Sequence, residues 1–74
     1  MKQIVVMTPE QAVTVLRKHG LGMATVTLRR GLEQGKYPFG ECVVQERQNV
    51  YHIYRRQLEE WIAEREMDVE EVSV

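Results

Sequence analysis

Apolar positions near the start of the chain have helical spacing. Thr8-Pro9-Glu10-Gln11 has the residue types of a helix start, because threonine caps a helix, proline tolerates its first position and glutamine reaches back to the cap. We predict a helix over residues 8–19, with one apolar face formed by Ala12, Val13 and Leu16. Gly20 and Gly22 end this helix, and Leu21 between them is expected to pack inward.

A second helix is predicted over residues 25–34, with Gly35 as its stop. Its apolar side is formed by Leu28, Gly31 and Leu32. The opposite side consists of Val26, Arg30 and Glu33, flanked by Thr27, Arg29 and Gln34. Two short helices joined by a glycine-containing turn are typical of a helix-turn-helix motif, and also of an ordinary helical hairpin.

The second half of the chain predicts a hairpin and a last helix. Residues 42–45 and 50–54 are rich in β-branched and aromatic side chains and predict two strands, with residues 46–49 as a polar tip. Apolar residues at helical spacing predict a helix over residues 56–66, with Trp61 as an anchor of the core. The expected core consists of Leu16, Leu28, Leu32, Val43, Ile53, Leu58, Trp61 and Ile62.

Composition is that of one small globular domain. The 74 residues are 43% hydrophobic and 28% charged, which is too apolar for general disorder. We expect an N-terminal segment over residues 1–7, an α+β domain of mainly α character over residues 8–66, and an acidic flexible tail over residues 67–74. No signal-peptide pattern or membrane-spanning run occurs, so a cytoplasmic location and no membrane partner are expected.

Charge is distributed unevenly along the chain. Residues 14–56 contain eight basic and three acidic residues, whereas residues 57–74 contain seven acidic residues and one arginine. A basic body with an acidic end is compatible with binding a polyanion through one face. Arg55 and Arg56 lie where the last helix begins, and a helix N-terminus disfavours cations. Their partner is either DNA phosphate or, as we favour, Glu59 and Glu60 one turn later.

Catalytic and metal-binding patterns do not stand out. Cys42 is the only cysteine and is expected to be a half-buried strand residue, while His19 and His52 are distant in sequence and are interpreted as a helix-end and a strand-surface residue. The only serine, Ser73, lies in the tail, and no glycine-rich phosphate loop follows a strand. We therefore expect a protein that is not an enzyme and that needs no cofactor or metal.

Three stretches resemble the MerR-like and excisionase group of small DNA-binding domains found in prophages and other mobile elements. They are residues 8–12 (TPEQA), residues 27–40 (TLRRGLEQGKYPFG) and residues 54–62 (YRRQLEEWI). The resemblance covers residues 8–66 and implies a winged helix-turn-helix, in which the predicted hairpin is the wing. This chain departs from the group at Ala24, where serine or asparagine usually caps the second helix, so that either Thr25 caps it or its start is loose.

The resemblance also implies which residues contact DNA. The second helix would lie in the major groove and the wing on neighbouring phosphates or the minor groove. The implied DNA-binding residues are Thr25, Val26, Thr27, Arg29, Arg30, Lys36, Arg47, Gln48 and Asn49. Arg29 and Arg30 are the strongest candidates, because a guanidinium bonds two guanine acceptors or a phosphate with fixed geometry.

Three functions remain open from the sequence. The first is sequence-selective binding of double-stranded DNA, either as an excisionase-type architectural factor, with an integrase or other mobile-element protein as a further partner, or as a transcriptional regulator. The second is a protein-interaction module on the same scaffold that docks a phage or host protein through Val26 and the acidic tail, which the net charge of −1 favours. The third is a DNA-packaging adaptor. The oligomeric state is open as well.

Overall fold

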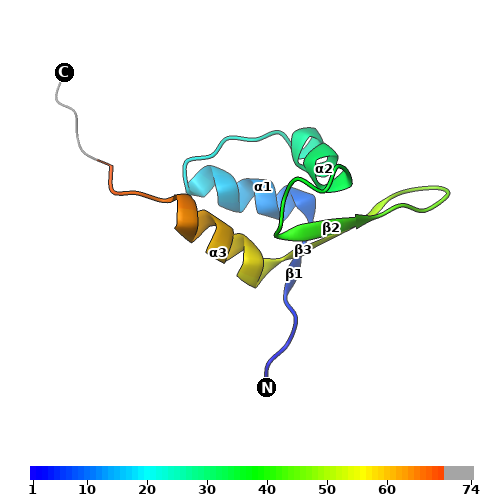
Figure 1. Cartoon of the computed structure of the whole chain (residues 1–74), viewed down its shortest axis with the longest axis horizontal. Helices are drawn as coiled ribbons and strands as arrows, with labels where there is room; N and C mark the ends of the chain where they lie inside the picture. The colour runs from blue at the N-terminus through cyan, green and yellow to red at the C-terminus, as the bar shows by residue number, and fades with distance from the viewer. Residues whose placement is uncertain (70–74) are drawn as a thin grey trace.

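The computed structural model describes residues 1–69 and shows an α+β fold, as the sequence predicts. The elements follow the order β1 (Val6–Met7), α1 (Pro9–Lys18), α2 (Thr25–Glu33), β2 (Gly40–Val43), β3 (Val50–Tyr54) and α3 (Arg55–Arg65). The helices lie beside the sheet, and the loop between β2 and β3 projects from the body (Figure 1). No helix in this range is long and apolar enough to span a membrane.

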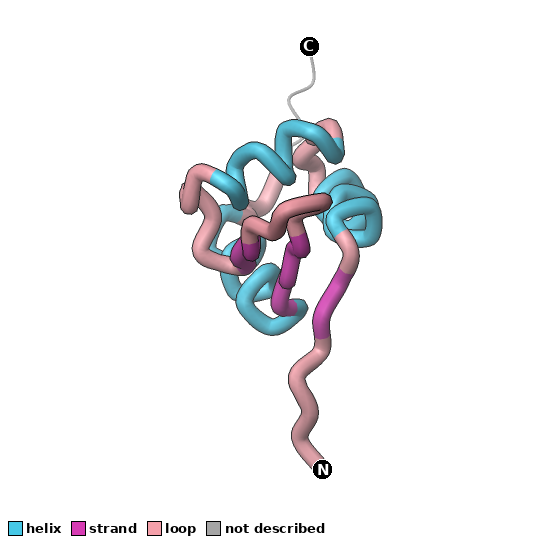
Figure 2. The backbone as a smooth tube through the Cα atoms, turned by 90° about the vertical axis from the view of Figure 1, so that its right-hand side faces the viewer, coloured by secondary structure: helices cyan, strands magenta, loops and turns pink. Residues whose placement is uncertain are grey.

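The sheet contains a strand that the sequence pattern does not predict. Its order is β1-β3-β2, and both pairings are antiparallel. In β1, Val6 lies opposite Tyr54 and Met7 opposite Ile53. β1 lies outside the expected hairpin, and the segment that precedes it extends away from the helices (Figure 2).

Local signals at the helix ends act as the sequence suggests, with one exception. Thr8 and Gln11 form a reciprocal capping box. The Gln11 backbone amide donates to Thr8 Oγ1 at 3.1 Å, and the Thr8 backbone amide donates to Gln11 Oε1 at 3.0 Å. Gly35 follows α2 with a φ of 68°, which glycine adopts without strain. Ala24 caps α2 without a side-chain hydrogen bond, so Thr25 is not the cap and the start of α2 is held by its backbone alone.

The core lies between the helices and one face of the sheet. Among residues 1–69 it contains nine buried apolar residues: Ala12, Val13, Leu16, Leu28, Leu32, Phe39, Ile53, Leu58 and Ile62. Six of the eight predicted core positions are therefore confirmed. Trp61 is only half-buried and packs against this core, whereas Phe39, which lies between the predicted second helix and the predicted hairpin, is fully buried between Tyr37 and Trp61.

Two predictions about burial are wrong, for different physical reasons. Val43 is 42% exposed, because β2 begins at Gly40 and its register places Cys42 opposite Tyr51, on the face that packs against the core. Side chains alternate along a strand, so Val43 points to the other face. Leu21 is 40% exposed, because the turn after α1 leaves it at the surface. Met67 and Asp68 are exposed and lie outside any helix or strand, and the remainder of the predicted tail, residues 70–74, is outside the described range.

Candidate nucleic-acid interface

The outward side of α2 forms the centre of the candidate interface. Leu28, Gly31 and Leu32 form the buried side of α2, so helical spacing turns the residues on the opposite side toward solvent. Val26 is 61% exposed and Thr27 and Arg30 are also exposed, while Thr25 is half-buried. Three of the predicted contact residues, Val26, Thr27 and Arg30, are therefore exposed together on α2.

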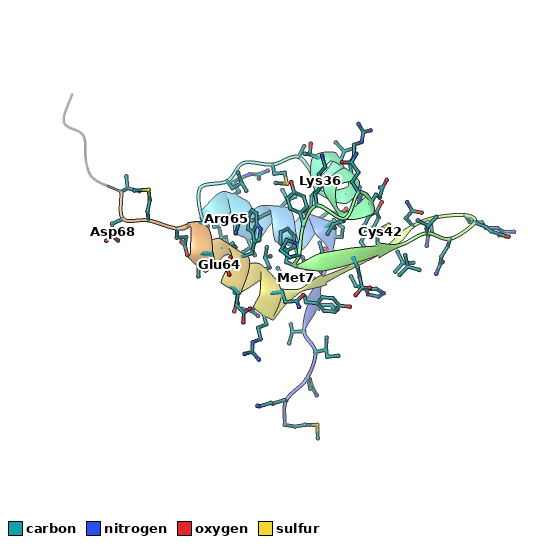
Figure 3. All side chains as sticks on the ribbon, in the orientation of Figure 1. Met7, Lys36, Cys42, Glu64, Arg65 and Asp68 are labelled. Carbon is teal, nitrogen blue, oxygen red and sulfur yellow. The ribbon has the colours of Figure 1, made fainter. Side chains whose placement is uncertain are left out.

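A shallow groove of about 370 Å³ follows this side of α2. It is lined by Val26, Thr27, Arg30, Gly31, Gln34, Lys36 and Tyr37. Within residues 1–69, neither Arg30 nor Lys36 has an ion-pair partner. Lys36 lies beside α2, away from Glu64 and Asp68 at the far end of the molecule (Figure 3). The groove therefore combines two uncompensated cations with one valine, one threonine and one glutamine side chain.

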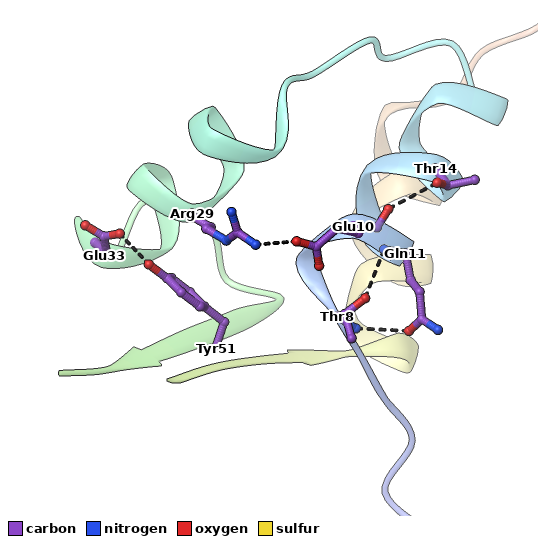
Figure 4. Close-up of polar contacts among 7 residues, drawn as sticks. All are labelled: Thr8, Glu10, Gln11, Thr14, Arg29, Glu33 and Tyr51. Carbon is purple, nitrogen blue, oxygen red and sulfur yellow. Dashed lines mark hydrogen bonds and ion pairs between the residues drawn. The ribbon is translucent and has the colours of Figure 1, made fainter. Parts of the chain in front are cut away.

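Arg29 lies in a different environment from its neighbour Arg30. Its guanidinium forms an ion pair with Glu10 in the first turn of α1, and it lies over the Tyr51 ring at 5.9 Å (Figure 4). Its side chain is 39% exposed. These contacts tie α2 to α1 and to β3, so that Arg29 holds the helix in position and its charge is largely compensated.

Glu33 is also occupied by a contact within the protein. The Tyr51 hydroxyl donates to Glu33 Oε2 at 2.6 Å (Figure 4). This hydrogen bond to the carboxylate raises the pKa of Tyr51 above its ordinary value of 10.0, because ionised tyrosine would lose the bond and face an anion. The contact fixes the angle between the end of α2 and β3.

The hairpin tip contributes the remaining predicted residues. Arg47 and Gln48 are exposed and Asn49 is half-buried. Gln48 and Asn49 line a groove of about 500 Å³ together with Arg29, Tyr51 and the start of α1. Arg47 does not line that groove, and within the described part of the chain it has no ion-pair partner. Seven of the nine predicted residues therefore line two separate grooves, whereas Thr25 and Arg47 line neither of them.

The arginine pair at the start of α3 is compensated inside the helix, as we favoured from the sequence. Arg55 pairs with Glu59 at 2.9 Å and Arg56 with Glu60 at 3.2 Å, both one turn away. Exposed pairs of this kind contribute only a few tenths of a kcal/mol, about 0.3–0.5 each. Their main consequence is that α3 presents a charge-balanced to acidic surface, unlike α2.

Other reactive side chains do not gather into a site. His19 ends α1 and its Nδ1 lies 2.9 Å from Glu66 Oε2, while His52 lies on the sheet and Cys42 is a half-buried free thiol. Across residues 1–69, no three histidine, cysteine or acidic residues are placed to hold a metal ion.

Two residues of the site were missed by sequence reasoning. Glu10 and Tyr51 position Arg29 and Glu33, yet each lies 18 or 19 residues from its partner. The available signals were an acidic residue in the first turn of α1 and an aromatic residue on a strand. Neither is specific, because acidic residues are generally favoured at helix starts and aromatic residues in strands.

Comparison with protein-family models, with curated proteins and with solved structures finds no match for this chain. The arrangement of its own residues is therefore what bears on function.

Proposed function

We propose that this protein binds double-stranded DNA as a winged helix-turn-helix, with α1 and α2 as the helix-turn-helix and the β2–β3 hairpin as the wing. The observation that carries the proposal is the uncompensated Arg30 on the exposed side of α2, with Lys36 in the same groove. A helix with this outward side fits the major groove, where arginine bonds guanine O6 and N7.

Each residue of the interface has a role in this proposal. Arg30 reads a base, and Val26 and Thr27 contact a thymine methyl or a base edge. Lys36 and Arg47 neutralise phosphates, and such contacts supply affinity without sequence information. Arg29 is a positioning residue, because Glu10 and Tyr51 already hold its guanidinium.

A biological role in a mobile element belongs to the same proposal. The resemblance of residues 8–66 to excisionase-type and MerR-like domains supports either bending DNA during excision or regulating a promoter. Both roles need the interface on α2, and the two differ in which additional protein is recruited.

Protein docking through α2 is the second candidate. It is favoured by Val26, an apolar side chain that is 61% exposed on the same surface. Apolar side chains are common at the centre of protein interfaces, whereas a groove reader is mostly polar. Charge separates the two functions, because only DNA binding depends on Arg30 contacting a base and on Lys36 neutralising a phosphate.

Fluorescence anisotropy with duplexes selected from a random-sequence library tests the proposal. Binding should weaken steeply as salt rises, because each neutralised phosphate releases counterions. Arg30→Ala should weaken binding to the selected duplex by about 5- to 150-fold, corresponding to the 1–3 kcal/mol of one base contact.

Arg56→Ala is the matched control. It removes the same charge from α3, where Arg56 pairs with Glu60, and it should change affinity far less than Arg30→Ala. Absence of binding to any selected duplex at low salt would contradict DNA binding and favour protein docking. Equal losses for the two variants would contradict the placement of the interface on α2.

A further inference from the structure

β1 is an open edge of the sheet. It ends the strand order β1-β3-β2, so one side of it has no strand within residues 1–69. The Val5 carbonyl accepts a hydrogen bond from the Arg55 amide, which directs the backbone groups of Val5 toward β3. Backbone polar groups alternate in direction along a strand, so those of Val6 face away from β3, and those of Ile4 do the same once residues 3–5 continue the strand. They form a ready site for pairing with another strand.

The residues of this edge lack the features that usually prevent such pairing. Natural edge strands carry charged side chains, proline or bulges. Residues 3–7 (QIVVM) contain no charge and no proline, and the β-branched run within them favours strand structure. Ile4 is 80% and Val6 52% exposed. At the other edge, by contrast, β2 carries the charged Glu41.

We infer that two copies of this chain associate through β1, with residues 3–7 of each copy paired antiparallel across a twofold axis. The two three-stranded sheets would then form one continuous sheet. This inference is independent of DNA binding, because it uses neither α2 nor the hairpin tip.

The pattern of the segment favours a second copy as the partner strand. If the axis passes through Val5, Ile4 of one copy lies opposite Val6 of the other, and the outward backbone groups of both residues meet. Ile4 and Val6 share the sheet face of Tyr54, so that the pairing buries β-branched side chains against one another on that face. An isologous interface requires a self-complementary surface of this kind.

Charge selects the antiparallel direction. Lys2 is the only charged side chain among residues 1–7. In a parallel pair the two Lys2 side chains would lie side by side, which is unfavourable. In the antiparallel pair they lie at opposite ends, and each approaches Thr8 of the other copy, beside the acidic first turn of α1 that contains Glu10.

Sedimentation equilibrium over a concentration series, without DNA, tests the inference. The protein should pass from one to two chains, and hydrogen exchange at the Ile4 and Val6 amides should slow as the dimer forms. Ile4→Lys places two like charges in the paired strands and should raise the dimer dissociation constant by about tenfold or more. Ile4→Pro should act in the same direction, because it removes an outward amide hydrogen.

Val44→Lys is the matched control, since Val44 is an exposed valine that directly follows β2, the strand at the other edge of the sheet. It should dimerise like the unaltered protein. Circular dichroism should show all variants folded, because Ile4 precedes β1 and is exposed.

A single chain at every concentration, or growth beyond two chains, would overturn the inference. So would dimerisation of Ile4→Lys and Ile4→Pro as strong as that of the unaltered protein. A dimer that binds no duplex would contradict the proposed function and leave this inference intact. A monomer that binds DNA would contradict this inference and leave the proposed function intact.

Discussion

Gly31→Ala should destabilise this protein, although the same change stabilises most helices. Alanine is favoured over glycine in a helix interior by about 0.5–1 kcal/mol. Here, however, a Cβ at position 31 would lie 2.1 Å from Tyr37 Cε2 and 2.7 Å from Tyr37 Cδ2. These distances are far inside van der Waals contact, so the ring would have to move.

The Tyr37 ring has little room to move away. It stacks on Phe39 with 5.1 Å between ring centroids and meets the edge of Trp61 at 6.1 Å. Its hydroxyl lies 3.8 Å from the Met23 sulfur. Overpacking of a fixed site costs about 1–3 kcal/mol. After the gain in helix propensity is subtracted, we expect a net loss of about 1–2 kcal/mol for Gly31→Ala.

Thermal and urea unfolding followed by circular dichroism measure this effect. The midpoint temperature should fall by about 4–8 °C per kcal/mol in a domain of this size. Gly22→Ala is the control, because a Cβ there meets nothing within 4 Å. In a Tyr37→Ala background, Gly31→Ala should become stabilising, which a double-mutant cycle detects. A single Gly31→Ala variant more stable than the unaltered protein would show that the Tyr37 ring yields to the added methyl group without cost.

Two further predictions concern the core and the sheet. Phe39→Ala should lower the free energy of unfolding by about 3–5 kcal/mol, a large share of the 5–15 kcal/mol typical of a native domain. The loss should exceed that of Trp61→Ala, because Phe39 is fully buried and Trp61 is not. Urea unfolding that ranks the two variants in the opposite order would contradict this prediction. The hydrogen bond to Glu33 raises the pKa of Tyr51 in the folded protein above the ordinary 10.0. The bond therefore stabilises the fold fully below pH 10, and this stabilisation is lost as the pH rises through the pKa of the folded protein. Tyr51→Phe should therefore lose less stability than the unaltered protein between neutral and strongly alkaline pH, and parallel pH profiles for the two proteins would show that this contact is absent.

Local patterns predicted the helices of this chain because the signals that begin each helix and set its buried side lie within the helix or directly beside it. The capping box at Thr8 and Gln11, the apolar spacing of α2 and the i, i+4 pairs of α3 all involve residues within one turn. The buried positions of these helices follow from the same spacing. β3 was also predicted at its observed bounds, because its five residues are β-branched, aromatic or histidine.

Features set by distant residues could not be predicted in this way. β1 exists because Val6 and Met7 pair with β3, nearly fifty positions later, and two residues carry no recognisable period. Phe39 was not among the predicted core residues, since its burial depends in part on Trp61, which belongs to α3. The error at Val43 arose because the local pattern does not show which face of the strand packs against the core; the pairing of Cys42 with Tyr51 sets that face and turns Val43 outward.

The candidate site shows the same division. The outward position of Arg30 follows from helical spacing alone, and the structure agrees with it. Arg29 was grouped with Arg30, but its partner Glu10 lies on another helix. Nothing in the local sequence distinguishes two adjacent arginines of which one is compensated and the other is not.

Amide chemical-shift mapping by NMR during titration with a selected duplex shows directly whether α2 is the surface that binds DNA. If α2 enters the major groove, the largest shifts should occur at the exposed residues Val26, Thr27 and Arg30, with further shifts at Lys36 and Arg47. The amides of α3 should change little, because its surface is charge-balanced to acidic. Shifts that concentrate on α3, with α2 unaffected at saturating duplex, would contradict the account.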